Sequence, residues 1–398
     1  MSSGTPIIRI AAKGDGVAAD GRHVPGAVTG DTVLEDGSLQ SGPHHATPPC
    51  RHFGLCGACQ LQHADEAALE RFVRERVAFG AQSQGLDVGE LLPTHLSPTH
   101  SRRRATLHGL RTAKGAVLGF REEKSNRVVD LQECHVLHPD LVKAVPPLRQ
   151  LIARHGGKGS VDVGLAMVDE GVDCSISNFP MEGLEATEAL LDLAREYGFA
   201  RLAVDLGFGP EALWEPKPVT VTLSGVPVAY PSGSFLQATP DAERVMLQDA
   251  QAWLEGMHSV ADLFSGLGTF TFALREDRSV TAFEAARDAH LECLAAARRT
   301  GSRLEVRHRD LFRNPLQPDE LAQFDAVLLD PPRAGAREQV DAIAQSEVAR
   351  VVYISCNPSS WARDAARLAS AGFKLEKLRP VGQFRWSTHV ELTSLFVR

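Results

Sequence analysis

The sequence predicts an α/β protein, with a doubly wound, mostly parallel sheet in its C-terminal part, an α+β region before it and a small β module at the N-terminus. Three observations carry this prediction. Apolar strands alternate with helical stretches from about residue 231 onward, residues 46–230 mix both patterns, and residues 1–45 hold only short strands and many glycines. Alternation of strand and helix is typical of a parallel sheet covered by helices on both faces.

The composition fits a globular protein of two or three domains. The chain has 398 residues, of which 43% are hydrophobic and 23% charged, and its net charge is −8. No stretch approaches the roughly eighteen apolar residues of a membrane span, and the N-terminus lacks the basic start and apolar run of a secretory signal. We therefore expect a cytoplasmic protein that binds no membrane. The sequence indicates no obligate protein partner.

The N-terminal module, residues 1–45, contains one strong hairpin signal. Val17–Ala19 and Arg22–Val24 flank Asp20-Gly21, a two-residue turn of the kind that joins antiparallel strands. The module is too short to close a five-stranded barrel by itself. Two further strands are expected, Ile7–Ala11 and Thr32–Leu34.

The middle region, residues 46–230, is expected to combine a helix over Asp65–Gln82 with several strands. Between Arg102 and Arg127 there are eight Lys or Arg and two acidic residues. Such a run is either a solvated face or a phosphate-binding surface on an otherwise acidic protein. The expected strands are Val117–Phe120, Arg127–Leu131, Val161–Val168, Val172–Ser177 and Ala200–Asp205.

The C-terminal region, residues 231–398, is expected to hold seven strands with helices between them. The strands are Val260–Phe264, Val280–Glu284, Leu304–Arg307, Ala326–Asp330, Val351–Ser355, Leu375–Val381 and Thr393–Val397. The helices lie near Phe270–Arg275, Ala285–Thr300, Ala336–Gln345 and Ser360–Ala371, after a first helix that starts at Pro240. Ligands of such sheets bind at the carboxyl ends of the strands.

A nucleotide-cofactor site is predicted at these strand ends. Gly266 and Gly268, in Asp262-Leu-Phe-Ser-Gly-Leu-Gly-Thr269, let the backbone after the first strand approach a ligand closely. Glu284 ends the second strand, where a carboxylate can accept both ribose hydroxyls, and Asp330 ends the fourth. The third glycine of the dinucleotide fingerprint and the lysine of a phosphate-binding loop are missing, which disfavours NAD and ATP.

Two further motifs predict the chemistry. Cys356, in Ser355-Cys-Asn-Pro358, stands between a strand and a helix, whose N-terminus can favour a nucleophilic thiolate. Glu391, or else His389, in Thr388-His-Val-Glu391, is the candidate base. A thiolate and a base suit methylation of carbon 5 of uracil, because that carbon attacks a methyl donor only after a thiolate has added at carbon 6. Arg333 stands where many amino-methylating enzymes carry an aromatic residue, which argues against nitrogen methylation.

A cysteine set in the middle region has the spacing of a metal centre. Cys50, Cys56 and Cys59 follow one another at intervals of six and three, and Cys134 is a possible fourth ligand from a distant segment. Zinc and an iron–sulfur cluster both fit four thiolates. A zinc site more typically has two close pairs of cysteines, so the spacing favours a [4Fe–4S] cluster by a modest margin.

Taken together, these motifs resemble the bacterial class I S-adenosylmethionine-dependent RNA uridine-5-methyltransferases, specifically the iron–sulfur branch that modifies 23S rRNA. The resemblance covers nearly the whole chain and is carried by Cys50–His63 with Cys134, Asp330–Gly335, Ser355–Pro358 and Thr388–Glu391. It implies three domains. These are a truncated TRAM-like β module over residues 1–45, a central iron–sulfur and RNA-binding domain over 46–230, and a Rossmann-like seven-stranded methyltransferase domain over 231–398.

The resemblance also implies roles for individual residues. Cys356 would be the nucleophile and Glu391 the base. S-adenosylmethionine would be the methyl donor, in contact with Gln237, Phe264, Glu284 and Asp330. The [4Fe–4S] cluster would be held by Cys50, Cys56, Cys59 and Cys134.

One departure from the family pattern lies beside the base. Gly382-Gln-Phe-Arg385 stands where the family commonly has Asp-x-Phe-Pro, so Gly382 cannot provide the expected carboxylate. The expected partner is RNA, most of all 23S rRNA, because the tRNA enzymes of this family generally lack the cysteine set. A tRNA uridine-5-methyltransferase, a nitrogen-directed methyltransferase and a non-catalytic iron–sulfur RNA-binding protein are the alternatives.

Overall fold

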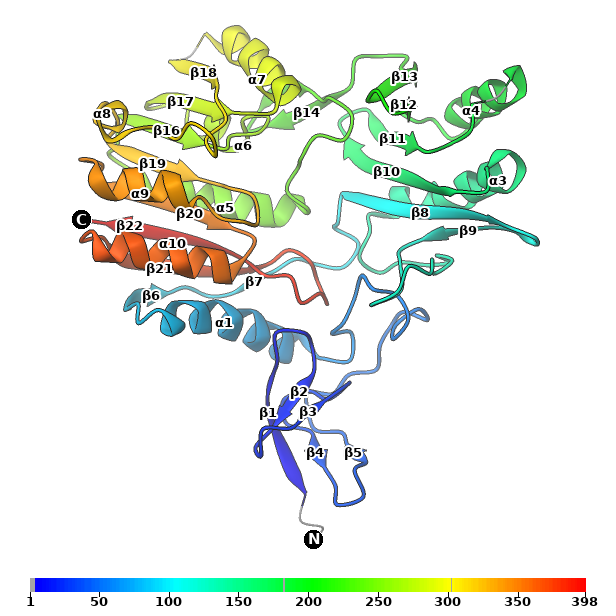
Figure 1. Cartoon of the computed structure of the whole chain (residues 1–398), viewed down its shortest axis with the longest axis horizontal. Coiled ribbons are helices and arrows are strands. Elements are labelled where there is room, and N and C mark those ends of the chain that lie inside the picture. The colour runs from blue at the N-terminus through cyan, green and yellow to red at the C-terminus, as the bar shows by residue number, and fades with distance from the viewer. Residues whose placement is uncertain (1–3, 182, 302) are drawn as a thin grey trace.

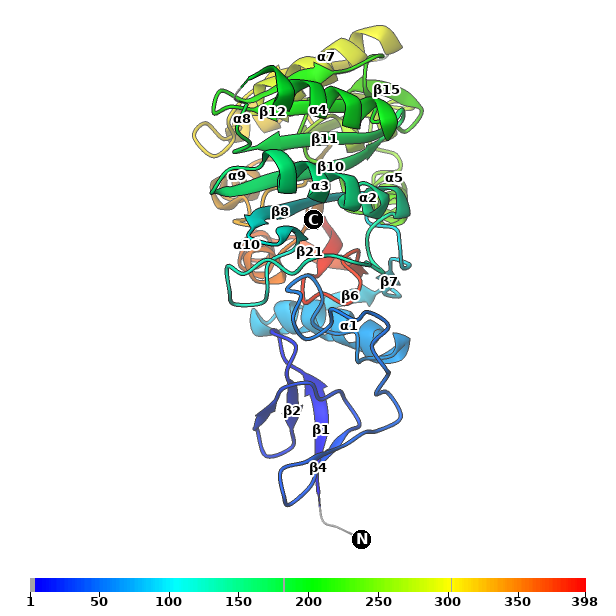
Figure 2. The ribbon, with the colours of Figure 1, turned by 90° about the vertical axis from the view of Figure 1, so that its right-hand side faces the viewer.

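The structure of the protein is a computed structural model that describes residues 4–181, 183–301 and 303–398. A large sheet flanked by helices lies beside a second sheet, and a small β module projects below both (Figure 1). Turned by a quarter, the second sheet and its helices face the viewer, and the module stays at one end of the molecule (Figure 2). No helix of the described ranges is long and apolar enough to span a bilayer.

The N-terminal module is a five-stranded sheet in the order β3-β2-β1-β4-β5. The predicted hairpin is confirmed, because β2 and β3 pair in antiparallel fashion around Gly21, whose φ is 87°. The fifth strand, β5, was not expected. The strands are β1 (Thr5–Ile10), β2 (Gly16–Ala18), β3 (His23–Val24), β4 (Thr32–Val33) and β5 (Leu39–Gln40).

The second sheet has six strands in the order β13-β12-β11-β10-β8-β9, and three helices complete its core. The strands are β8 (Arg104–Thr112), β9 (Gly115–Gly119), β10 (Ser160–Val168), β11 (Gly171–Ser177), β12 (Arg201–Asp205) and β13 (Pro210–Trp214). The helices are α2 (Pro139–Lys143), α3 (Val145–His155) and α4 (Leu184–Glu196). A two-stranded hairpin, β14 (Thr220–Leu223) and β15 (Val226–Ala229), follows it.

The strand expected over Arg127–Leu131 is wrong. In the described part of the chain, this segment forms an isolated bridge between Arg121 and Val128 and is otherwise irregular. The Asp130 carboxylate accepts the backbone N–H of Leu118 at 3.1 Å, where a regular ladder would supply a backbone carbonyl. The side chain of Asp130 therefore interrupts the pairing that the apolar residues predict.

All seven strands expected in the C-terminal region form one sheet, which gains two more from residues 88–96. The order is β18-β17-β16-β19-β20-β22-β21-β6, and β7 also pairs with β21. The neighbours from β18 to β20 are parallel, and β22 runs antiparallel to β20 and β21. The strands are β6 (Val88–Leu91), β7 (His95–Leu96), β16 (Ser259–Leu263), β17 (Ser279–Glu284), β18 (Leu304–His308), β19 (Ala326–Leu329), β20 (Arg350–Ser355), β21 (Lys374–Gly382) and β22 (Glu391–Val397).

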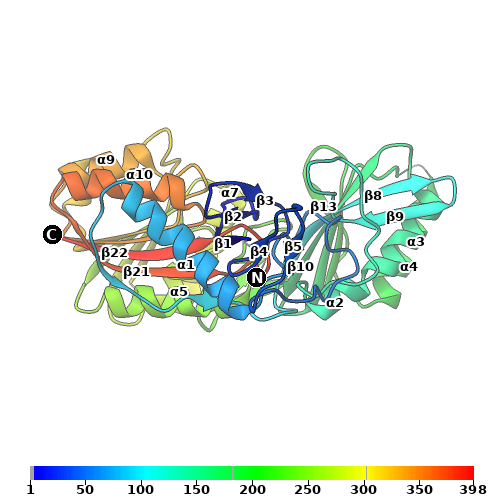
Figure 3. The same ribbon diagram turned by 90° about the horizontal axis from the view of Figure 1, so that it is seen from below.

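Helices cover both faces of this sheet, as the sequence predicts. In β20, Val351 and Tyr353 pack on one face and Val352 and Ile354 on the other, which follows the two-residue period of a strand. Figure 3 shows that α1 and α10 lie next to each other over strands β21 and β22. Helix α1 comes from the middle region, yet it packs in the same core as α9 and α10. The helices are α1 (Glu66–Ser83), α5 (Pro240–Trp253), α6 (Thr269–Ala273), α7 (Arg287–Thr300), α8 (Pro318–Leu321), α9 (Arg337–Gln345) and α10 (Pro358–Ser370).

Candidate active site

The structure brings the six residues expected to act in catalysis or cofactor binding to one cavity of about 1160 Å³. The cavity lies at the carboxyl ends of the parallel strands, where ligands of such sheets bind. Residues of the second sheet also line it, among them Arg104 and Phe120, so the cavity is formed between the two sheets. The six residues are Gln237, Phe264, Glu284, Asp330, Cys356 and Glu391.

One half of the cavity is built by the glycine turn after β16. The Glu284 carboxylate accepts the backbone N–H of Gly266 at 2.8 Å and that of Ala286 at 2.6 Å, so two turns hold it in place. Phe264 has a φ of 65°, an unusual backbone conformation for a residue with a side chain. Its ring lies 5.3 Å from that of Phe312, measured between centroids. These residues form an aromatic wall beside a carboxylate that is held in place.

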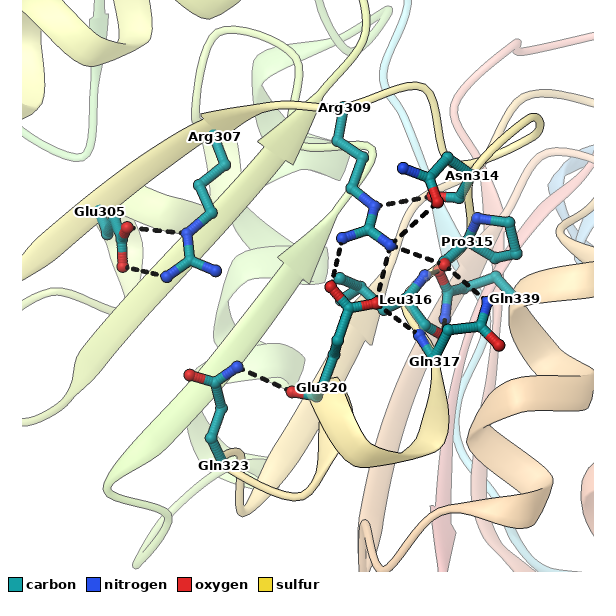
Figure 4. A network of polar contacts seen from close by, with 10 residues as sticks. All are labelled: Glu305, Arg307, Arg309, Asn314, Pro315, Leu316, Gln317, Glu320, Gln323 and Gln339. Carbon is teal, nitrogen blue, oxygen red and sulfur yellow. Dashed lines mark hydrogen bonds and ion pairs between the residues drawn. The ribbon is translucent and has the colours of Figure 1, made fainter.

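The loop after β18 is held against this wall by Arg309. Its guanidinium donates to both carboxylate oxygens of Glu320, at 2.6 and 2.8 Å, and to the backbone carbonyls of Asn314 and Pro315, at 2.7 and 2.8 Å (Figure 4). A planar guanidinium can donate to a carboxylate and to backbone carbonyls at the same time. The loop carries Phe312, so Arg309 fixes that aromatic residue at the cavity.

Cys356 follows β20 directly and is half-buried at the cavity wall. Asn357 caps α10 by accepting the N–H of Ser359 at 3.1 Å, which explains why the strand ends and the helix begins here. Burial raises the pKa of the Cys356 thiol to about 11, and the carboxylates of Glu391 and Asp330 add to this increase. Burial and these charges outweigh any favourable effect of the helix N-terminus, so the thiol form of Cys356 is favoured in the free protein.

Glu391 begins β22 and is 5% exposed. Burial raises the pKa of its carboxyl to about 7, against a hydrogen bond from Gln383 and the positive charges of Arg104 and Arg333. A carboxylate with a pKa near neutrality is suited to accept a proton at physiological pH. Burial instead lowers the pKa of His389, the other candidate base, and the charges of Arg333 and Arg102 lower it further.

Gln237 and Asp330 lie between the part of the cavity built by the glycine turn and the part that holds Cys356 and Glu391. The amide of Gln237 donates to the Asp330 carboxylate at 3.1 Å. Burial raises the pKa of Asp330 well above its usual range, and the nearby charge of Glu391 raises it further. Glu391, Asp330 and Cys356 therefore act on one another electrostatically, although they come from three different strand ends.

The first three arginines of the basic stretch are engaged within the protein. Arg103 pairs with Glu243 and donates to the Gln237 carbonyl at 2.9 Å. Arg104 donates to the Leu236 carbonyl at 2.5 Å, and Arg102 to the Arg104 carbonyl at 3.0 Å. Replacing these three arginines by acidic residues would disturb the segment that carries Gln237. Such a variant would therefore not test phosphate binding alone.

The structure also gathers the four cysteines of the predicted cluster. Burial raises the pKa of Cys59 to about 12, opposed by a hydrogen bond with Gln62, and the nearby thiols of Cys134, Cys56 and Cys50 add to the increase. The backbone N–H of Leu137 points at the Cys134 sulfur, 3.5 Å away. Over the described ranges, no group of three or more His, Cys, Asp or Glu side chains is arranged to hold a metal ion.

All four cysteines are half-buried free thiols in this structure. Gly57 and Ala58, between Cys56 and Cys59, line the large cavity, so the cysteine loop forms part of its rim.

Two cavity residues were missed by the sequence analysis. Phe312 is 44% exposed and stands two residues after Asp310, so an aromatic residue just past the third strand was the available signal. Phe235 is 59% exposed, and the Arg104 guanidinium lies 4.5 Å from its ring centroid. No sequence pattern links Arg104 and Phe235, because their contact depends on how the two sheets meet.

Comparisons with known proteins identify relatives of this chain. A family model described as tRNA (Uracil-5-)-methyltransferase matches residues 305–398. An uncharacterized RNA methyltransferase of Zymomonas mobilis is 46% identical over 98% of this chain and 99% of its own. A 23S rRNA (uracil(1939)-C(5))-methyltransferase, RlmD, of Chromohalobacter salexigens is 33% identical over 90% of this chain and 78% of its own.

A solved structure shares the fold over the whole length. The Pyrococcus abyssi tRNA (uracil-54, C5)-methyltransferase, in complex with S-adenosyl-L-homocysteine, superposes with a TM-score of 0.78 at 22% identity and covers 99% of both chains. Fold and cavity together define an S-adenosylmethionine-dependent methyltransferase. From its relatives, the chain belongs to the RNA (uracil-5-)-methyltransferase family.

Proposed function

We propose that this chain methylates carbon 5 of a uridine in 23S rRNA through a covalent adduct between Cys356 and carbon 6 of the base. The observation that carries the proposal is the meeting of a thiol, a buried carboxyl with a pKa of about 7 and the cofactor residues in one cavity. Nitrogen methylation needs neither a thiol nor a base at these positions. The relative RlmD, 33% identical, supports ribosomal RNA as the substrate.

The residues of the cavity divide the reaction between them. Cys356 gives its proton to solvent water and its sulfur adds to carbon 6, so that an S–C6 bond forms and the electrons of the C5–C6 double bond move into an enolate. S-adenosylmethionine, held by Gln237, Phe264, Glu284 and Asp330, supplies the methyl group when bound. Glu391 then takes the proton from carbon 5, the double bond re-forms, and the electrons of the S–C6 bond return to sulfur.

Access to carbon 6 requires the target base to leave its stack, because a thiol cannot reach that atom inside a helix. The rim of the cavity supports such a base with aromatic and basic groups. Phe235 offers an exposed ring with Arg104 on its face, and Arg121, Lys124 and Arg333 also line the opening. A flipped uracil would enter between these groups, with flanking phosphates near the positive charges.

The nucleophile is tested with 23S rRNA fragments that contain 5-fluorouridine, incubated with S-adenosylmethionine and analysed on denaturing gels and by mass. Fluorine cannot leave carbon 5 as a proton, so the methylated adduct should persist with the wild type and vanish with Cys356→Ala. Cys174→Ala is the matched control, because Cys174 is buried in the core of the second sheet. An adduct with tRNA alone would move the substrate to tRNA, and no adduct with either RNA would overturn the proposal.

We further propose that Cys50, Cys56, Cys59 and Cys134 hold a [4Fe–4S] cluster, which places the chain in the iron–sulfur branch of its family. Bound there, the cluster would fasten the cysteine loop at the cavity rim. Protein purified without oxygen should contain about four irons and four sulfides per chain. Cys59→Ser should lose the iron and sulfide, and Cys174→Ala should keep them. Zinc in place of iron, or no metal, would overturn this proposal.

We also propose that the enzyme acts in the cytoplasm, where its RNA substrate is found.

A further inference from the structure

Gln383 is buried where the two halves of the cavity meet. It lies just after β21, is 1% exposed and belongs to the stretch Gly382–Arg385 that departs from the family pattern. Its side-chain oxygen accepts the backbone N–H of Ala238 at 2.9 Å, and its amide nitrogen lies 3.3 Å from the side-chain oxygen of Gln237. Val381 of β21 pairs with Glu391, which sets Gln383, two residues further on, beside the Glu391 carboxyl, and a hydrogen bond from Gln383 is among the causes that lower the pKa of that carboxyl.

These contacts fix the orientation of both glutamine amides. A backbone N–H can only donate, so the oxygen of Gln383 must face Ala238. Its NH2 group then faces Gln237 and Glu391. Since Gln237 accepts through its oxygen, its own NH2 group faces Asp330, to which it donates at 3.1 Å. The hydrogen bonds thus run in one direction, from a fixed backbone donor to the two carboxyl groups of the cavity.

We infer that Gln383 is a positioning residue, which holds the carboxylate of Glu391 in the place and charge state that proton removal from carbon 5 requires. The inference rests on the proposed function, in which Glu391 is the base. In that step the C5–H electron pair forms the C5–C6 double bond, the proton passes to Glu391, and the S–C6 pair returns to Cys356. An amide donor keeps Glu391 an acceptor, because a hydrogen bond to a carboxylate favours its charged form.

Other groups around Glu391 act on it as well. Arg104 from β8 and Arg333 from the loop after β19 favour its charged form, whereas burial disfavours it. Asp330 and the Cys356 thiol also lie close enough to interact with Glu391. Of these surroundings, the hydrogen bond from Gln383 opposes burial most strongly. Its removal should therefore raise the pKa of Glu391, so that the base ionises only at higher pH.

The test is a single-turnover measurement of tritium release from RNA containing 5-tritiated uridine, with saturating S-adenosylmethionine, across the neutral pH range. Tritium leaves carbon 5 only in the proton-removal step. Gln383→Met keeps the volume but removes the donor, and the rising limb of the pH profile should move up by about one unit. Gln383→Glu keeps an acceptor for Ala238 but brings a second carboxyl beside Glu391, so its limb should move further in the same direction.

Gln339→Met is the matched control. Gln339 is also 1% exposed and also bonds a backbone segment through both ends of its amide, but its partner is Leu316, away from Glu391. Its limb should coincide with that of the wild type. If both Gln383 variants release tritium more slowly at every pH with the limb unmoved, Gln383 is a packing residue and the inference fails. If the wild type releases no tritium at all, the proposed function itself fails.

Discussion

Replacing Glu391 by Gln should stop turnover and at the same time stabilise the protein at alkaline pH. The carboxyl group is 5% exposed, and burial raises its pKa from 4.5 to about 7. The folded protein therefore binds this proton more tightly than the unfolded chain does, and stability is lost as pH rises from about 4.5 through 7. With 1.36 kcal/mol for each pKa unit, the ionised carboxylate costs about 3 kcal/mol at pH 8.

The assay is chemical unfolding of the wild type and of Glu391→Gln at about pH 5 and pH 8, read by linear extrapolation. The free energy of unfolding should fall between these pH values in the wild type, and the variant should avoid most of the ~3 kcal/mol due to this group. The Glu391 charge also raises the pKa of Asp330, so the variant removes this interaction as well, and both effects act in the same direction.

Glu320→Gln provides a comparison with the opposite sign. Its hydrogen bonds with Arg309 lower the pKa of Glu320 to about 2, so its contribution to stability is complete at both pH values and is lost only in stronger acid. This variant should be less stable than the wild type by the same amount at pH 5 and pH 8. A difference between wild type and Glu391→Gln that does not change with pH would refute the raised pKa and, with it, the choice of Glu391 as a base poised near neutrality.

Two further predictions concern the loops that shape the cavity. Arg309→Lys loses the paired hydrogen bonds to Glu320 and those to two backbone carbonyls. In steady-state methyl transfer, the KM for S-adenosylmethionine should rise roughly tenfold, or ~1.4 kcal/mol, while kcat stays nearly unchanged. An equal loss in kcat would contradict this prediction. Gly335→Ala and Gly372→Ala both place a side chain at positive φ, at a cost of about 1–2 kcal/mol. Of the two, only a Cβ at Gly335 would also clash with the Asp364 side chain, so thermal unfolding should show that this variant is clearly the less stable.

The parts of the fold that were predictable are those with continuous apolar strands. A strand such as β20 is buried on both faces, so it is apolar from Val351 to Ile354, and such a run predicts a buried strand without a structure. The carboxyl ends of such strands meet at one edge, which is why residues as distant as Glu284 and Cys356 could be assigned to one site. Strands β6 and β7 are short and half-exposed, and their residues carry no comparable pattern.

The electrostatics of the site could not be predicted in the same way. The pKa of Cys356 depends on carboxyl groups that arrive from β19 and β22, and the sequence around the cysteine contains neither. The run Arg102–Arg104 looks like a surface charge cluster, yet its side chains end on carbonyls and on Glu243 inside the protein. Charge counts in a sequence do not distinguish a cation offered to a ligand from one that ties two segments together.

The pairing of β6 with β21 has a consequence for how the chain folds during synthesis. Val88 pairs with Leu375, so two segments separated by most of the chain must meet before the large sheet is complete. Until α10, β21 and β22 have left the ribosome, the apolar side of α1 lacks the helix and strands on which it packs. Contacts of such long range slow folding and leave apolar surface open meanwhile. Once formed, β6 shields the edge of β21 from pairing with other chains. A cut between the region that carries the cysteines and the region that carries Cys356 would therefore expose a sheet edge, and we expect neither fragment to stay in solution without the other.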